Sequence, residues 1–523
     1  MALSYLPVDR DQQFLLPPSM RDWLPEGHLA WFVLEVVDRL DTSVLHARHP
    51  NVGVGRRAYD PDMLLALLIY AYCTGIRSSR QIERLCVVDI AFRVLAAGHA
   101  PDHTTIARFR QDHQDLAVQL FTDVLVLCAE AGLAKVGVVA VDGTKIGADA
   151  SLRANRTRAQ IEAEVKAMIA DADAVDAGED RLFGEDRGDE LPPELADPRR
   201  RGARLDAALK VLDAQHRERE AEAAAARAAR REAWDKRRQG AADDDHRPSG
   251  RPPAELELEL AEEALAHEER RAETRQRRRA EREADAAAKG HKVHGPKPSV
   301  EHRGLRRARR RVERARARAA DAAKNTTPAD ADERVNVTDP DSRIMKDPRG
   351  WVQGYNAQAA VNEHGVAFAA DVTQDGNDVE QCTPMMAATQ ANLDIAGITD
   401  PIGMMLFDAG YLSEDNLTAD GPDRLIATGK AWKLRRTGPT SGAPPEDATP
   451  IEAMEHRLRT PEGSTLYAMR QHTVEPVFGD VKHLRGFRRF SRRGLAAVDA
   501  EWKLVMTAHN ILKLFRQTPP PIA

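Results

Sequence analysis

Three acidic residues lie in sequence contexts where a carboxylate can take part in chemistry. Asp142 lies inside the apolar, strand-like segment VVAVDGTKI, and Asp408 directly follows the apolar segment IGMMLF. Glu475 lies in TVEPVFGDVKHLRGF, which has helical character. A carboxylate at the end of a buried strand is unfavourable unless it is paired or bound to a cation. Each residue alone also suits a strand-end turn, a helix cap or an exposed helix surface, but together they indicate one shared site.

Three converging carboxylates suit a divalent metal centre. Oxygen ligands favour Mg²⁺ or Mn²⁺ over zinc. Two such ions about 3.5–4 Å apart activate an attacking oxygen and stabilise a leaving oxygen in phosphoryl transfer. We therefore predict two Mg²⁺ (or Mn²⁺) ions at Asp142, Asp408 and Glu475. Asp149 is an alternative first ligand, but its strand context is weaker.

Basic residues surround the third acid. Lys482 follows Glu475 by seven residues, two helical turns, so the two side chains share one helix face. This lysine is expected to hold a phosphate beside the metal site. Arg470 precedes Glu475 by five residues, and a downstream cluster extends the positive charge as a phosphodiester backbone requires. The cluster consists of Arg485, Arg488, Arg489, Arg492 and Arg493.

The segments that carry these residues alternate between strand-like and helical patterns. Helical patterns run over 378–393, from near 413, over roughly 467–483 and over 495–516. Strands mixed with helices in this order indicate an α/β layer fold. The strand-like segments are 136–146, 352–361, 365–373, 402–407 and 424–428.

Residues 1–130 are expected to form an all-α domain that binds DNA. A strongly apolar helix begins at Pro61 and ends near Gly75. Short helices joined by tight turns follow, as in helix-turn-helix units; the alternative is a helical bundle for protein contacts only. The short helices are expected at Ser79–Leu85, Asp89–Ala97 and Thr104–His113, and the last carries the candidate DNA contacts Thr104, Thr105, Arg108 and Arg110.

Residues 156–325 differ from the rest of the chain in composition. This stretch has only two aromatic residues and is dominated by Ala, Arg, Glu and Asp, so it cannot bury a globular core of its own. We expect long polar helices at Ala254–Lys289 and Arg303–Ala320, with disorder around 171–203 and 240–253. Residues 303–318 carry nine arginines and one glutamate. They suit either contact with DNA or pairing with the acidic stretch 255–263 as a helical hairpin.

The overall composition excludes several classes of protein. The chain has 523 residues, enough for several domains, and a net charge of -6, which by itself does not indicate a nucleic-acid binder. Its four cysteines are far apart, which excludes a disulfide scaffold and a cysteine zinc ribbon. The longest apolar run, 63–73, is shorter than the about 20 residues that span a bilayer. With no secretion signal evident at the start, we expect a cytoplasmic protein without membrane contact.

Several blocks of the sequence resemble the DDE transposases of bacterial insertion sequences. VVAVDGTKI, MMLFDAGYL and YAMRQHTVEPVFGDVKHLRGFRRFSRRG occur in the order of the family's catalytic blocks. The last block resembles the family's Tyr–Arg–Glu–Lys element, here Tyr467, Arg470, Glu475 and Lys482. Six residues separate the glutamate from the lysine, as in the family, but four rather than three separate the arginine from the glutamate. YDPDMLLALLIYAY, SSRQIE and PDHTTIARFR resemble the helical N-terminal domain of one large group of these transposases.

The resemblance implies a fold and an activity. It implies a ribonuclease H-like catalytic domain with the first aspartate on strand one, the second after strand four and the glutamate on a late helix. The polar insertion then falls between strands one and two. The expected organisation is a DNA-binding domain at 1–130, a catalytic domain at 131–155 and 326–516, a charged and partly disordered insertion at 156–325, and a tail at 517–523.

The implied reaction is cleavage of the element's ends and their joining to target DNA. Hydrolysis by a metal-activated water precedes attack by the freed 3′ hydroxyl, without a covalent protein–DNA intermediate. The expected partners are the terminal inverted repeats, target DNA and further copies of the chain, as a homodimer or larger assembly. Two alternatives remain: a nuclease of the same fold that cuts without joining, and a DNA-binding or scaffolding relative with an inert site.

Overall fold

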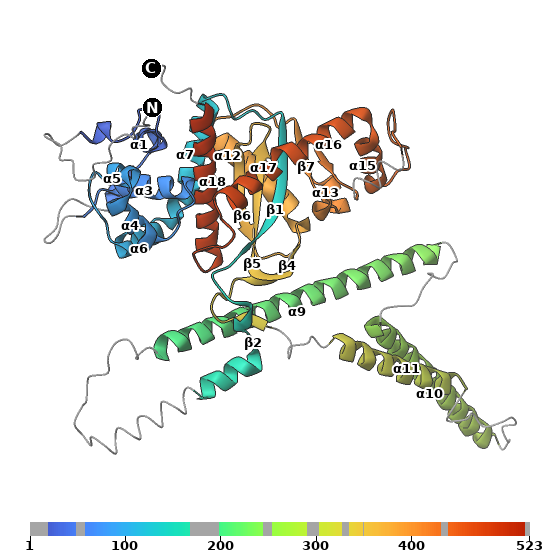
Figure 1. Cartoon of the computed structure of the whole chain (residues 1–523). Coiled ribbons are helices and arrows are strands. Elements are labelled where there is room, and N and C mark those ends of the chain that lie inside the picture. Colours follow the sequence, from blue (N-terminus) through green and yellow to red (C-terminus); the bar gives the residue numbers. More distant parts are fainter. Residues whose placement is uncertain are drawn as a thin grey trace, which may run out of the picture. The chain divides into compact units, whose positions relative to one another are not determined.

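The computed structural model describes most of the chain. The described ranges are 19–48, 58–167, 198–243, 254–289, 303–326, 334–348, 350–429 and 438–517. They belong to two compact units, the first formed by Met1–Asn155 with Asn336–Ala523 and the second by Arg156–Val335. The first unit is mixed α/β, with a helical N-terminal region and a central sheet (Figure 1).

The helices of the N-terminal region begin at clear capping signals. Asp60 caps α3, accepting a hydrogen bond from the Met63 amide, and Pro61 occupies the first turn, where an amide hydrogen has no partner. A serine or aspartate side chain caps α4, α5 and α6 in the same way. The predicted short helices are thereby confirmed, with ends shifted by three residues at most. The bounds are α1 (Leu29–Arg39), α2 (Ser43–Arg48), α3 (Pro61–Cys73), α4 (Ser79–Val88), α5 (Ile90–Leu95), α6 (His103–Asp112) and α7 (Ala117–Glu130).

A six-stranded mixed sheet forms the centre of the first unit. β1 runs antiparallel to β5 and parallel to β7, and β7 runs parallel to β8. On its other side, β5 pairs antiparallel with β4 near its start and with β6 further along. The strands are β1 (Val138–Gly147), β4 (Arg343–Asp347), β5 (Gly350–Asn362), β6 (Ala367–Thr373), β7 (Met404–Phe407) and β8 (Arg424–Ile426).

All five predicted strands are present, whereas β4 was not predicted. The predicted strands carry runs of buried residues, such as the four of β7. In β4 the sequence RIMKD contains three charged residues and only one buried side chain, so its composition gives little strand signal.

The C-terminal helices differ from prediction in one place. Instead of one helix over 467–483, the structure has α16 (Pro461–Thr473), α17 (Glu475–Gly479) and a π-helical turn at Asp480–Leu484. Pro476 lacks the amide hydrogen needed to continue the α16 ladder, which explains the break. The other helices of this part are α12 (Cys382–Ile395), α13 (Glu414–Thr418), α15 (Pro450–Arg459) and α18 (Leu495–Gln517).

Helix α18 connects the helical region to the sheet. It packs against α3 and α7 on one side and β6 on the other (Figure 1). Trp502 is fully buried, and its indole N–H donates to the Gln358 carbonyl at 2.8 Å. One apolar core therefore runs through both parts of the first unit. No helix among the described residues is long and apolar enough to cross a membrane.

The second unit consists mainly of long helices. They are α9 (Pro198–Asp243), α10 (Ala254–Ala288) and α11 (Arg303–Thr326), and α10 packs along α11. The expected disorder at 171–197 and 244–253 lies outside the described residues, whereas 198–203 and 240–243 belong to α9. Short strands β2 (Asn155–Thr157) and β3 (Arg334–Asn336) pair where the chain passes between the units.

Candidate active site

Asp142 and Asp408 lie at the same level of two neighbouring parallel strands. Ala140 of β1 is paired with Leu406 of β7, so each aspartate follows a paired residue by two positions. Since adjacent strands are about 4.8 Å apart and side chains alternate with period two, the two carboxylates leave the sheet side by side. Each is held by a nearby amide: Asp142 accepts from Gly143 at 2.9 Å and Asp408 from Gly410 at 2.8 Å.

One guanidinium serves both aspartates. The Nη2 atom of Arg470, on α16, lies 2.8 Å from Asp142 Oδ2 and 4.0 Å from Asp408 Oδ2. Burial disfavours the arginine's charge, yet the nearby Asp142, Tyr467, Asp408 and Glu475 raise its pKa. Its Nε atom is buried without a hydrogen-bond partner among the described residues. Arg470 is therefore held by charge attraction rather than by a complete hydrogen-bond network.

The Asp142 carboxyl has a strongly altered acidity. Burial raises its pKa to about 6, and the charges of Asp408 and Asp378 act in the same direction against the attraction of Arg470. Three carboxylates, Asp142, Asp408 and Asp378, share two cations, Arg470 and Lys145, so negative charge is in excess. Such a site gains stability from a further cation.

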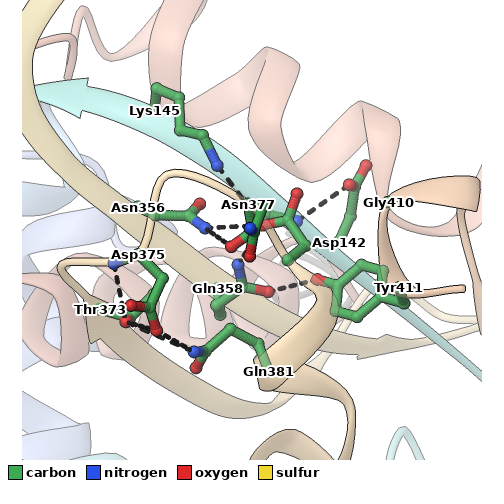
Figure 2. Close-up of polar contacts among 12 residues, drawn as sticks. Asp142, Lys145, Asn356, Gln358, Thr373, Asp375, Asn377, Gln381, Gly410 and Tyr411 are labelled. Carbon is green, nitrogen blue, oxygen red and sulfur yellow. Dashed lines mark hydrogen bonds and ion pairs between the residues drawn. The ribbon is translucent and has the colours of Figure 1, made fainter. Parts of the chain in front are cut away.

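Asp378 is a further carboxylate beside Asp142 and Asp408, and the sequence interpretation used it only as the start of a helix. It accepts hydrogen bonds from Asn356 at 2.6 Å and Gln358 at 2.8 Å and pairs with Lys145 at 3.4 Å. Figure 2 shows these three partners converging from β1 and β5. The signal that could have found it is the polar pair Asn356 and Gln358, two residues apart and so on one face of the strand.

A glycine beside Asp142 makes room for this arrangement. A Cβ atom at Gly143 would lie 2.5 Å from Asp378 Oδ1 and 2.3 Å from Gln358 Nε2. Tyr411 also borders the site, because its hydroxyl donates to Gln358 (Figure 2). Its pKa is raised well above the ordinary value by burial and by the three nearby aspartates.

Glu475 lies on a helix rather than beside the end of a strand. It is the first residue of α17 and is exposed, although its charge reaches Arg470. Within the described part of the chain, no group of three or more histidine, cysteine or acidic side chains is close enough to hold a metal ion. The structure thus brings Asp142 and Asp408 together at Arg470, and the charge of Glu475 acts on the same guanidinium.

Tyr467 and Lys482 contact the two strands that carry the aspartates. The Tyr467 hydroxyl donates to the carbonyl of Phe407 at 3.1 Å, and burial raises its pKa to about 12. The Lys482 amine donates to the carbonyl of Lys145 at 2.9 Å. Both side chains of the predicted element therefore lie against the ends of β1 and β7.

The predicted arginine cluster is divided. Arg488 and Arg489 are exposed. Arg485 is buried, in contrast to the expected outward-facing charge: its Nε donates to Asp480 at 3.0 Å and Nη1 to the Val505 carbonyl at 3.1 Å. Asp149, the alternative first ligand, instead pairs with Arg493 at 2.8 Å.

The candidate DNA contacts on α6 are also divided. Arg108 is exposed. The hydroxyls of Thr104 and Thr105 both donate to the capping carboxylate of Asp102. Arg110 points inward, donating to the Tyr72 hydroxyl at 3.3 Å and the Arg77 carbonyl at 3.0 Å, so it stabilises the fold rather than facing solvent. A sequence pattern does not reveal which arginine is buried, because the long apolar stem suits either environment.

Comparison with known proteins gives family matches for two segments of the first unit. Residues 18–112 match a family described as a transposase domain (DUF772), and residues 445–515 match the transposase DDE domain. The second match includes Arg470, Glu475 and Lys482. No curated protein and no solved structure matched the chain. Both matched families are transposase domains and occur in the expected order, which supports the identification of the chain as a DDE transposase of an insertion sequence.

Proposed function

We propose that this transposase cuts DNA at the ends of its insertion sequence and joins those ends to target DNA, using Asp142, Asp408 and Glu475 as catalytic carboxylates. The matched register of Asp142 and Asp408, both within reach of Arg470, carries the proposal. Two carboxylates at the same level of adjacent parallel strands are a suitable base for metal-assisted phosphoryl transfer. The proposed catalytic domain has a ribonuclease H-like fold built on this sheet.

The donor set suits an oxygen-preferring divalent cation. Burial and the charges of Asp408 and Asp378 stabilise the protonated form of Asp142. A bound cation would instead favour the ionised carboxylate. We propose that Asp142, Asp408 and Glu475 hold two Mg²⁺ or Mn²⁺ ions, the exposed Glu475 side chain turning towards the pair. When bound, such ions supply positive charge to the attacking and leaving oxygens of a phosphodiester.

The other side chains of the site would position the DNA. Lys482 and the exposed Arg488 and Arg489 would bind backbone phosphates, which is the main source of affinity for DNA. Tyr467 fixes the end of β7 through the Phe407 carbonyl, directly before Asp408. In the N-terminal region, the exposed Arg108 is the remaining candidate for contact with the terminal repeat.

The proposed reaction has two phosphoryl transfers. In the first, a water oxygen bonds to the scissile phosphorus, and the bond to the 3′ oxygen breaks to leave a 3′ hydroxyl and a 5′ phosphate. In the second, that 3′ oxygen bonds to a target phosphorus and displaces the target's own 3′ oxygen. No bond forms between protein and DNA, and we propose that two or more copies of the chain hold the two ends in one complex.

A strand-transfer assay tests this function. The substrate is DNA carrying the inverted repeats that flank the gene, incubated with purified full-length protein, Mg²⁺ and a target plasmid. Joined product is the expected result. Nicking without joining would identify a nuclease, and binding without nicking would identify a relative with an inert site.

A further inference from the structure

A groove runs from the aspartate site to the β4–β5 hairpin. It has a volume of about 730 Å³ and is bounded by β1 from Gly143 onward, by the hairpin and by the turn that carries Lys482. We call it the hairpin groove. A groove of this size beside a reaction site is suited to hold an extended part of a substrate.

The end of the hairpin groove away from the aspartates carries an exposed aromatic residue. Trp351, near the start of β5, is 65% exposed and is paired across the hairpin with Lys346. No other aromatic ring or guanidinium among the described residues stacks on its indole. Ile344, on the neighbouring strand, is 45% exposed. A large aromatic side chain that the fold leaves in water is informative, since tryptophan is usually buried over most of its surface.

Cationic groups line the wall between these two ends. Lys145, Lys346, Lys482 and Arg488 all border the hairpin groove. Hydrogen bonds hold Lys482 and Arg488 in place along the groove. The Lys482 amine donates to the Lys145 carbonyl at 2.9 Å, and the Arg488 Nε donates to the Lys482 carbonyl at 3.0 Å. The carboxylates on the wall are Asp347 and Asp378, and Asp378 already pairs with Lys145 and two amides. The wall therefore favours a polyanion.

The length of the hairpin groove can be judged from the strand register. Asp142 is paired with Ala359, eight residues along β5 from Trp351. At about 3.3 Å per residue this is roughly 26 Å. An extended, unpaired strand of several nucleotides covers this length.

We propose that the hairpin groove binds an unpaired segment of DNA strand, with a base stacked on Trp351 several nucleotides from the aspartate site and phosphates on the lysines. The proposal rests on the proposed function, since it assumes that DNA reaches Asp142. An unpaired strand fits better than a duplex because duplex bases are already stacked on each other and offer no free face to the indole. An aromatic platform combined with a cationic track is the general means of binding single strands.

Binding of a short single strand tests the proposal. The probe is fluorescein-labelled oligothymidine of about twelve nucleotides, longer than the groove, titrated with full-length protein in EDTA and followed by anisotropy. Trp351→Ala should weaken binding about tenfold, because stacking contributes about 1–3 kcal/mol per base. Trp351→Phe should restore most of the affinity. A random duplex should bind both variants as it binds the wild type.

Two further variants separate this role from general effects. Ile395→Ala, at an exposed apolar residue of α12 (64% exposed), is the matched control and should bind like the wild type. Lys346→Gln should lower the slope of log affinity against log salt concentration by about 0.7 for each phosphate that the variant no longer binds. Unchanged affinity in Trp351→Ala, or an equal weakening on duplex and single strand, would overturn the proposal. A change in oligomeric state in Trp351→Ala would also overturn it, since the indole would then cover a second copy.

The metal-free assay keeps the two proposals distinguishable. If binding of the single strand depends on Trp351 but the wild-type protein never cleaves element ends, the proposal for the hairpin groove is supported and the catalytic proposal is refuted. A protein that cleaves and joins DNA with no dependence of binding on Trp351 would do the reverse.

Discussion

Charged side chains lie in contrasting environments in the two units of the chain. In the first unit, the side chains of Arg470 and Asp142 are only 13% and 18% exposed and share a crowded site. In the second unit, Arg316 of α11 pairs with Glu262 of α10 at 2.9 Å, with exposures of 67% and 46%. Screening by water makes such an exposed pair weak, about 0–1 kcal/mol. Burial makes the interaction between Arg470 and Asp142 in the first unit much stronger.

Context, rather than the number of charges, therefore identifies a reactive site. The insertion has far more acids and bases than the sheet, but most of its pairs are formed on helix surfaces. The apolar strand beside each site aspartate is the informative feature. It reduces contact with water, so that the few charges at the site change one another's pKa strongly.

Removal of the catalytic carboxylates should give the largest effect. Asp142→Asn, Asp408→Asn and Glu475→Gln should each reduce cleavage and joining by about a thousandfold or more, since metal coordination contributes several kcal/mol to the transition state. Binding of element-end DNA should persist, because it depends on basic residues elsewhere. Gel assays of cleavage and anisotropy measurements of binding check both expectations.

Asp149→Asn is the matched control for that prediction. Asp149 belongs to a surface pair with Arg493, 40% and 48% exposed, so its replacement should leave most of the activity. Wild-type cleavage by Glu475→Gln would remove Glu475 from the site. An inactive Asp149→Asn beside an active Asp142→Asn would move the first ligand to Asp149.

The strands and the paired aspartates could be predicted from local sequence. β1 and β7 are rich in β-branched or apolar residues, and the helix caps Asp60, Ser78 and Asp102 stand directly before their helices. These signals act within a few residues. The matched register of Asp142 and Asp408 depends on strand pairing across the long insertion, and only the structure provides it.

Other features could not be predicted because they depend on long-range packing. Asp378 joins the site only because β5 brings Asn356 and Gln358 beside β1. Arg110 and Arg485 are buried because tertiary contacts supply carbonyl and carboxylate partners to their guanidinium groups. A sequence gives the charge of an arginine but not the partner that decides its role.

A buried ion cluster in the first unit should matter to stability far more than a surface pair. Asp480 lies 3.0 Å from Arg485, 3.5 Å from His509 and 3.6 Å from Arg516, with its side chain 10% exposed. Asp480→Ala leaves the buried guanidinium without its partner and should lower the free energy of unfolding by about 3 kcal/mol. Tryptophan fluorescence during urea unfolding, to which the buried Trp502 contributes, measures this.

Glu262→Ala is the corresponding change in the second unit. Its exposed pair with Arg316 should contribute about 0.5 kcal/mol or less. Equal destabilisation in the two variants would contradict the contrast between buried and exposed charges.

The same cluster should also produce a dependence on pH. Burial opposes ionisation of Asp480, but His509, Arg485 and Arg516 outweigh it and hold its pKa at about 2, below the ordinary 3.8. A lowered pKa stabilises the fold above pH 4, and this contribution is lost as the pH falls towards 2. Asp480→Asn should therefore lose less stability than the wild type over that interval. Parallel acid titrations in EDTA check the difference, and identical curves would contradict the assignment.

The arginines of α11 should give the smallest effect and the closest test of the contrast between the two units. Of the two roles left open by the sequence, pairing with α10 is present: Arg309 and Arg316 contact Glu269 and Glu262, and buried apolar residues join the helices. Several other arginines of α11 are exposed. They include Arg306, Arg307, Arg310, Arg311 and Arg314.

If these exposed arginines contact DNA, their effect is general attraction to phosphate. Replacing Arg306, Arg307, Arg310 and Arg311 by alanine should weaken binding of element-end DNA several-fold and reduce the salt slope by about 0.9 for each phosphate that is no longer neutralised. The double variant Arg309→Ala/Arg316→Ala is the control, because these two arginines already pair with acids of α10. Their loss should weaken the packing of α10 against α11 more than it changes the salt slope. Cleavage at saturating protein should be unchanged in both, since neither variant alters a proposed catalytic carboxylate. An unaltered slope in the four-residue variant would leave self-pairing as the role of α11 and make the contrast between the two units complete.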